Sequence, residues 1–80
     1  MPSTSFTGNC LNKDGDHGNF SGEKVNSPEE CHERCKEEKD CVAFAVSSKS
    51  SKYCYLYEKG PYTQGDGLGA YTCYVMPGTT

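Results

Sequence analysis

The chain has 80 residues, a formal net charge of −3 and only 34% apolar residues, with no Trp. This length is enough for one domain, and a core built from so few large apolar side chains is marginal by itself. The acidic balance, without a basic cluster, argues against a nucleic-acid partner, and no segment is long and apolar enough for membrane insertion.

The N-terminal part is polar and rich in turn-forming residues. We expect residues 1–8 to be a disordered leader and Asn9–Leu11 to begin a first strand. Residues 12–19 are expected to form a loop that Phe20 anchors on the core. Asn19 begins an Asn-Phe-Ser sequon, which makes it a candidate N-glycosylation site on a surface loop.

One helix is predicted to start at Pro28 and to end between Lys36 and Lys39. Ser27 is a good N-cap residue, and Glu30 is placed to complete a capping box. The segment contains no Leu, Ile, Val, Phe or Met, so its inward face reduces to two cysteines four residues apart, Cys31 and Cys35. We therefore expect covalent bonds, rather than a hydrophobic stripe, to hold this helix to the domain.

Two strands are predicted on either side of a polar hairpin loop at residues 47–52. Residues 41–46 alternate small side chains with Val or Phe, a pattern typical of a strand. We expect the face with the small side chains to allow close approach of the helix. The face with Val and Phe side chains is expected to fill a core behind the sheet. The partner strand, residues 53–57, places Cys54 and Leu56 on one face and three tyrosines on the other.

The C-terminal part is predicted to contain a turn, a loop and a closing strand. Residues 58–61 form the turn, the glycine-rich residues 62–69 a mobile loop, and residues 70–76 the strand. With these elements the domain is expected to span residues 9–76, followed by a flexible tail at residues 77–80.

Six cysteines, spread over nearly the whole chain, predict a disulfide framework. They are Cys10, Cys31, Cys35, Cys41, Cys54 and Cys73. Each disulfide typically contributes ~2–4 kcal/mol by reducing the entropy of the unfolded chain, and this supplies stability that the core lacks. The framework indicates an oxidising compartment, so we expect a secreted protein whose secretion signal lies upstream in a longer chain.

Two metal-binding alternatives are weaker. A zinc site would use the three central cysteines with His17 or His32, but structural zinc sites usually contain two close ligand pairs and this chain has one. A calcium loop of the EF-hand type would use Asn12, Asp14, Asp16 and Glu23. However, His17 replaces the glycine that such a loop needs at its sixth position, and no flanking helices are predicted. We expect neither a metal nor another cofactor.

A family resemblance is carried by the run from Ser27 to Phe44, followed by Tyr53-Cys54-Tyr-Leu-Tyr57. This run resembles the apple (PAN) domain family, in which a capped helix with two cysteines precedes a cysteine that opens a strand. The resemblance covers Cys10–Cys73 and implies an α+β fold with one helix packed on a small antiparallel sheet. It also implies three disulfides, Cys10–Cys73, Cys31–Cys54 and Cys35–Cys41.

The acidic helix, the short unit and the Tyr-rich C-terminal half are similar to the galactose-binding apple domains of apicomplexan micronemal adhesins. The resemblance implies a non-catalytic lectin module of a secreted adhesin, stored in a microneme, that binds terminal galactose of host-cell glycans and contacts other adhesin subunits. The alternatives are an apple domain that docks another secreted adhesin or a protease, and a spacer without its own ligand. We expect no enzymatic activity, because no nucleophile–base arrangement is present.

The tyrosines suggest where a sugar would bind. All six lie between residues 53 and 74, around a glycine-rich loop. A pyranose has an apolar C–H face that stacks on aromatic rings and hydroxyls that need donors and acceptors. We therefore expect Lys59 to donate, Asp66 to accept, and Tyr62 or Tyr71 to stack, with Tyr57 beside them. Galactose is favoured, because its axial hydroxyl leaves one face clear for a ring.

Overall fold

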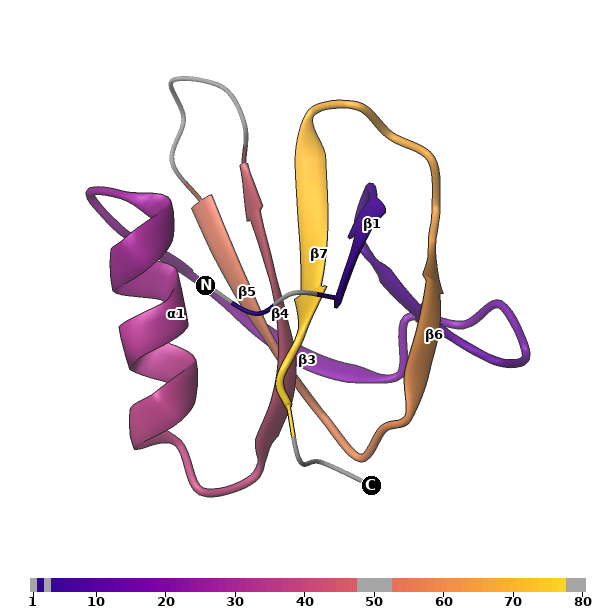
Figure 1. Ribbon diagram of the computed structural model, residues 1–80, viewed down its shortest axis with the longest axis horizontal. Coiled ribbons are helices and arrows are strands. Elements are labelled where there is room, and N and C mark those ends of the chain that lie inside the picture. Colours follow the sequence, from indigo (N-terminus) through magenta and orange to yellow (C-terminus); the bar gives the residue numbers. More distant parts are fainter. Residues whose placement is uncertain (1, 3, 48–52, 78–80) are drawn as a thin grey trace.

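The computed structural model describes residues 2, 4–47 and 53–77. Its main sheet has five strands, and the helix α1 (Pro28–Glu37) covers one face of it (Figure 1). Neighbouring strands of this sheet are antiparallel. Their order across the sheet is β1 (Thr4–Thr7), β7 (Tyr71–Val75), β4 (Cys41–Ser47), β5 (Tyr53–Glu58) and β3 (Asn19–Lys24). A second sheet pairs β2 (Cys10–Asn12) with β6 (Tyr62–Gly65). The predicted α+β fold is confirmed.

The helix starts where the sequence places it. Ser27 is the N-cap, and its hydroxyl accepts a hydrogen bond from the backbone N–H of Glu30 at 3.2 Å. The Glu30 carboxylate accepts from the backbone N–H of Asn26 at 2.8 Å, so the reciprocal bond of the capping box falls one residue early. Cys31 and Cys35 are the buried residues of α1, as its apolar-free sequence requires.

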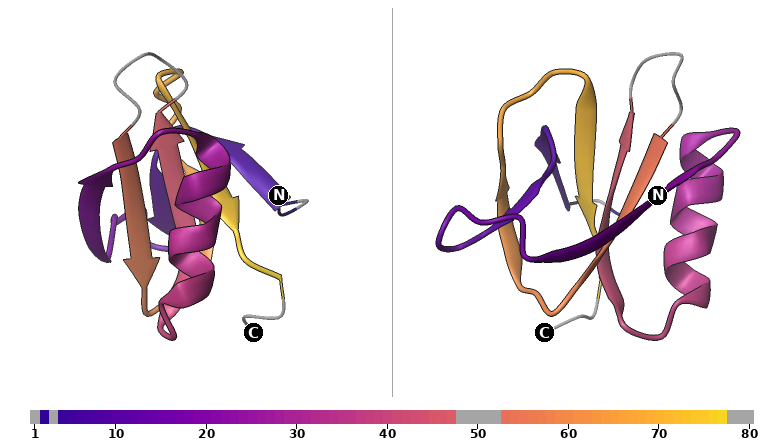
Figure 2. Two further views of the ribbon diagram at one scale, coloured as in Figure 1. Left: turned by 90° about the vertical axis from the view of Figure 1, so that its left-hand side faces the viewer. Right: turned by 180° about the vertical axis from the view of Figure 1, so that it is seen from behind.

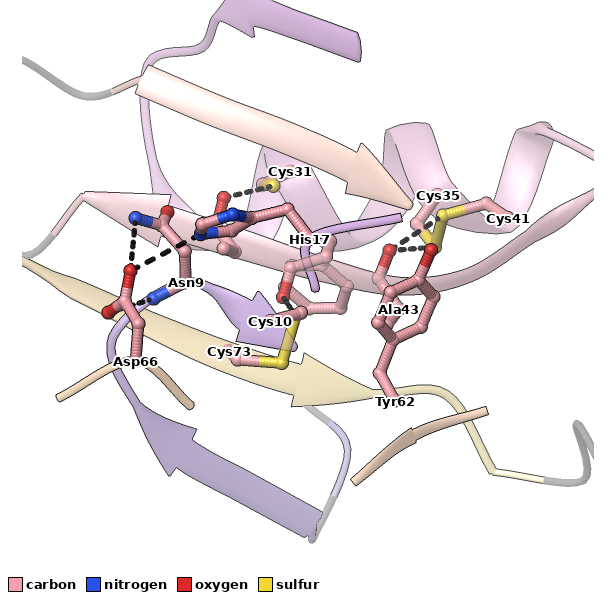
Figure 3. The surroundings of a disulfide bond; sticks show 12 residues. Asn9, Cys10, His17, Cys31, Cys35, Cys41, Ala43, Tyr62, Asp66 and Cys73 are labelled. Carbon is pink, nitrogen blue, oxygen red and sulfur yellow. Dashed lines mark hydrogen bonds and ion pairs between the residues drawn. A yellow bond between two sulfur atoms is a disulfide. The ribbon is translucent and has the colours of Figure 1, made fainter. Parts of the chain in front are cut away.

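The three disulfides are those that the family resemblance implied. Cys10–Cys73 spans 63 positions and joins β2 to β7, Cys31–Cys54 joins α1 to β5, and Cys35–Cys41 closes the turn after α1. Since no cysteine is free, the zinc alternative is excluded. Figure 3 shows cysteine sulfurs beside backbone carbonyl groups of β4. The sulfur of Cys10 lies 3.7 Å from the Phe44 carbonyl oxygen, and that of Cys31 lies 3.9 Å from the Ala45 carbonyl oxygen.

The helix packs on the face of β4 opposite to the predicted one. Phe44 and Val46 share a buried cluster with the helix cysteines, whereas Ala43 and Ala45 lie in a second cluster with the Cys10–Cys73 bond. The reason is the pairing of β4 with β5, which aligns Phe44 with Leu56 and Val46 with Cys54. Because Cys54 is bonded to α1, the helix must lie on that face (Figure 2).

Three segments differ from the sequence expectations. Residues 4–7 form β1 in register with β7 instead of belonging to a disordered leader, because Phe6 packs against the second cluster. Residues 62–65 form β6 instead of a mobile loop, held by pairing with β2. Phe20 does not anchor a loop in the core, because it lies on β3 with 51% of its surface exposed.

Two further expectations fall mainly on residues that the structure does not describe. Of the predicted hairpin loop, 47–52, only Ser47 is described, and it is the buried last residue of β4. Residues 78–80 of the predicted tail also lie outside the described residues. No helix within residues 4–47 and 53–77 is long and apolar enough to cross a membrane.

We predict that the three disulfides contribute unequally to stability. From the loss of loop entropy in the unfolded chain, Cys10–Cys73, with a sequence separation of 63, should contribute about 4 kcal/mol to the free energy of unfolding. Cys35–Cys41, with a separation of 6, should contribute about 2 kcal/mol. The Cys10→Ala/Cys73→Ala protein should therefore unfold at a much lower urea concentration than Cys35→Ala/Cys41→Ala, as followed by circular dichroism. Equal midpoints for the two double variants would contradict this account.

Candidate functional site

The residues predicted from the sequence do not form one site. Lys59 lies in the turn before β6 and Asp66 follows β6, so the strand separates them by roughly 13 Å at about 3.3 Å per residue. The rings of Tyr57 and Tyr62 are 1% and 4% exposed and pack edge to face, with their centroids 5.1 Å apart. A single sugar ring does not reach all of these groups.

Tyr57 and Tyr62 are buried residues of the core. Burial raises the pKa of the Tyr57 phenol far above its ordinary value, against a smaller opposing effect of a backbone hydrogen bond with Cys10. Burial also raises the pKa of Tyr62, whose hydroxyl donates to the carbonyl oxygen of Glu58. Both phenols are therefore neutral.

A cavity opens on the face of the sheet away from α1. Its volume is about 140 Å³, and it is lined by Asn9, His17, Phe20, Tyr55 and Tyr57. The register of β3 on β5 sets Phe20 opposite Tyr57 and Gly22 opposite Tyr55. The Phe20 ring lies 5.7 Å from the Tyr55 ring and 5.6 Å from the Tyr57 ring, centroid to centroid. A half-exposed aromatic ring therefore forms one wall.

Asp66 organises the polar side of the cavity (Figure 3). Its Oδ1 accepts from the backbone N–H groups of Asn9 and Leu68, each at 3.0 Å. Its Oδ2 accepts from Asn9 Nδ2 at 3.2 Å and lies 3.5 Å from His17 Nε2. The carboxylate thus has partners on both oxygens and positions Asn9 and His17 instead of facing a ligand directly.

These contacts require Gly8. A Cβ atom at this position would lie 2.1 Å from Asp66 Oδ1 and 2.6 Å from the backbone nitrogen of Gly67. The φ of Gly8 is +99°, a conformation that residues with a side chain rarely adopt. The close approach of two segments 57 residues apart therefore depends on a residue without a side chain.

Tyr57 is the one cavity residue that the sequence-based site included. The other four lining residues were missed, namely Asn9, His17, Phe20 and Tyr55, since nothing in the spacing links Asn9 and His17 to Asp66. Asn9 Oδ1 is a buried acceptor without a hydrogen-bond partner among the described residues. Such an atom costs free energy unless a donor reaches it. Asn9 and His17 both line the cavity, so the cavity combines an apolar ring with polar side chains.

The other candidates from the sequence lie elsewhere. Lys59 lines a separate hollow with Lys39, Asp40, Val42 and Glu58, where two positive and two negative side chains balance one another. Tyr71 is half-buried on β7, with its ring centroid 5.6 Å from that of Tyr55.

The candidate glycosylation site lies on a strand rather than on a loop. Asn19 is exposed as the first residue of β3, the edge strand of the main sheet. Alternation along the strand puts its side chain on the opposite face from Phe20. A glycan on Asn19 would therefore leave the cavity open.

The loop with the calcium-like spacing is organised by the side chain of Asn12. Asn12 Oδ1 accepts from the N–H groups of Asp14 at 2.9 Å and Asp16 at 3.0 Å, and Glu23 forms an ion pair with Arg34 at 3.5 Å. Within the described part of the chain, no three His, Cys, Asp or Glu residues are grouped to hold a metal ion. Of the calcium-like pattern, the Asn12 side chain thus stabilises the loop and the Glu23 side chain contacts the helix.

The comparison with known families fits this architecture. The sequence model of the PAN domain family matches residues 4–79. The chain belongs to the PAN domain family. PAN domains are generally non-catalytic modules that bind proteins or carbohydrates, and one so rich in disulfides is typical of extracellular proteins. Neither the curated proteins nor the solved structures contain a significant match to the chain.

We predict a pH-dependent contribution of Asp66 to the stability of this PAN domain. Burial acts to raise the pKa of Asp66, but the hydrogen bonds from Leu68, Asn9 and His17 outweigh it and lower the pKa below its ordinary value. A lowered pKa stabilises the folded state above the unfolded pKa of about 3.9, and this contribution is lost as the pH falls through the folded value.

Urea denaturation of wild type and Asp66→Asn between pH 2 and pH 7 tests this prediction. The wild type should be the more stable protein near neutral pH, and the difference should shrink below about pH 4. A difference that stays constant over the whole range would show that the charge of Asp66 does not hold the loop.

Proposed function

We propose that this PAN domain is the carbohydrate-recognition module of a secreted adhesin and that it binds galactose-terminated glycans on host cells. The observation that supports this proposal is the cavity beside Phe20, where a half-exposed aromatic residue shares the lining with the polar side chains of Asn9 and His17. A sugar needs this combination, because its C–H face stacks on a ring while its hydroxyls require polar partners.

The chemistry of the cavity suits an uncharged sugar. Asp66 is the carboxylate at its edge, and its oxygens are already engaged by Asn9, Leu68 and His17. Asn9 and His17 supply the polar side chains of the cavity lining to the sugar hydroxyls. Galactose presents an unobstructed C–H face to Phe20, because its axial hydroxyl lies on the other side of the ring.

The cavity also faces away from the chain ends. β1 and β7 pair so that Thr4 lies opposite Val75, while Thr7 lies opposite Thr72 at the far end of the ladder. Gly8 and Asn9 follow Thr7, and Asp66 meets them there. Further domains of a longer adhesin, attached at either end, would leave the cavity accessible. Several copies would add avidity to a site that is weak by itself.

Titration of the isotope-labelled domain with methyl β-galactoside, lactose and glucose, followed by amide chemical shifts, tests the proposal. We expect saturable shifts at Asn9, His17 and Phe20 with the two galactosides and not with glucose. Phe20→Ala should abolish binding without unfolding the domain, since the ring is 51% exposed. Lys59→Ala is the matched control and should bind as the wild type does, because Lys59 lies at the other end of β6.

Absence of shifts at millimolar galactoside would refute the lectin function. Loss of binding in Lys59→Ala together with normal binding in Phe20→Ala would instead place the sugar at the site that sequence reasoning favoured.

The alternative function is docking of another secreted adhesin or a protease. The observation in its favour is a second exposed apolar residue, Leu68, which is 57% exposed and whose backbone N–H is bonded to Asp66. Large exposed apolar side chains are common anchors of protein interfaces. A protein partner would be lost in Leu68→Ala and would not be displaced by free galactoside, whereas the sugar site should tolerate this substitution.

A further inference from the structure

The cavity continues into a row of aromatic rings across the sheet. From Phe20 the next ring is Tyr55, with centroids 5.7 Å apart, and from Tyr55 the next is Tyr71, 5.6 Å further on. Tyr53 flanks Tyr55 at 5.1 Å. These steps are comparable to the distance between neighbouring sugar rings in an oligosaccharide. The row therefore extends the binding surface by one sugar beyond the cavity.

Two small residues make this row possible. Gly22 lies opposite Tyr55, and a Cβ there would fall 2.6 Å from the Tyr53 ring and 2.8 Å from the Tyr55 ring. Ala45 lies on β4 between β5 and β7, in register with Tyr55 on one side. Because Ala45 has a small side chain, Tyr71 reaches Tyr55 across the central strand. A larger side chain at Gly22 would displace the rings.

The row is uncharged and half-buried. Tyr53, Tyr55 and Tyr71 are each of intermediate exposure, and the side chains of Tyr55 and Tyr71 are hydrogen-bonded to each other. The backbone beneath is already paired, since β5 lies between β3 and β4, and β7 lies between β4 and β1. A peptide that needs main-chain hydrogen bonds finds none free on this face, whereas a sugar needs only rings and hydroxyls.

We propose that Tyr55 and Tyr71 form a second subsite, which holds the penultimate sugar of a neutral oligosaccharide whose terminal sugar occupies the cavity. This inference rests on the proposed function, since it takes the cavity as the terminal-sugar site. The ligand class is thereby a disaccharide or longer neutral glycan rather than a single sugar. Tyr71 distinguishes the second subsite from the cavity, because it does not line the cavity.

The test compares lactose with methyl β-galactoside by amide chemical-shift titration. In the wild type, lactose should bind about fivefold to tenfold more tightly, the effect expected from one further aromatic contact. Tyr71→Ala should remove this gain and leave the affinity for methyl β-galactoside unchanged. Tyr71→Phe should keep most of the gain, because the ring remains. Tyr74→Phe, on the opposite face against Phe44, is the control and should change neither affinity.

The outcomes separate this inference from the proposed function. Equal affinities of the wild type for the two ligands would overturn the second subsite while leaving the cavity as a single-sugar site. Weakening of both ligands to the same extent by Tyr71→Ala, with an intact amide spectrum, would also overturn it. Binding of neither ligand at millimolar concentration would refute the proposed function and the subsite together.

Discussion

The covalent framework around β4 is the constraint on which the rest of the structure depends. Two disulfides attach α1 and its following turn on one face of this strand, and Cys10–Cys73 lies on the other face. Among the largest fully buried side chains in the described part of the chain, only Phe44 and Tyr57 are not cysteines. A chain with so few large apolar residues cannot offset its conformational entropy by burial alone, so cross-links that reduce the entropy of the unfolded state replace much of the missing core.

Much of the fold was predictable because its signals are local. The capped start of α1, the alternation in β4 and the β4–β5 pairing all follow from neighbouring residues. The disulfide pairing came from the family resemblance, since the spacing alone leaves it open. The face of β4 that meets the helix was predicted wrongly, because side-chain size suggested close approach over Ala43 and Ala45. The Cys31–Cys54 bond determines the face instead, and alternation contains no information about it.

The candidate site was much less predictable, for a physical reason. Its polar side joins Asn9 to Asp66 across 57 residues, and this contact exists because Gly8 has no side chain. β1, β3 and β6 have unremarkable sequences and become strands only through pairing with β7, β5 and β2. Tertiary pairing of this kind overrides local propensity. Consequently Tyr62, expected in a mobile loop, is buried, and Phe20, expected to anchor a loop, is the exposed ring.

The framework and the cavity are connected through one bond. Asn9 immediately precedes Cys10, so the Cys10–Cys73 disulfide fixes the backbone from which Asn9 reaches Asp66. On the other side of the cavity, Tyr57 lies in the same buried cluster as that disulfide. The walls are thus held before a ligand arrives, and little ordering entropy has to be lost on binding. A small ordering cost matters most for a ligand of few atoms, because the contacts of such a ligand provide only a small binding free energy. The cross-link that most stabilises the fold therefore also prepares the surface that we propose for recognition.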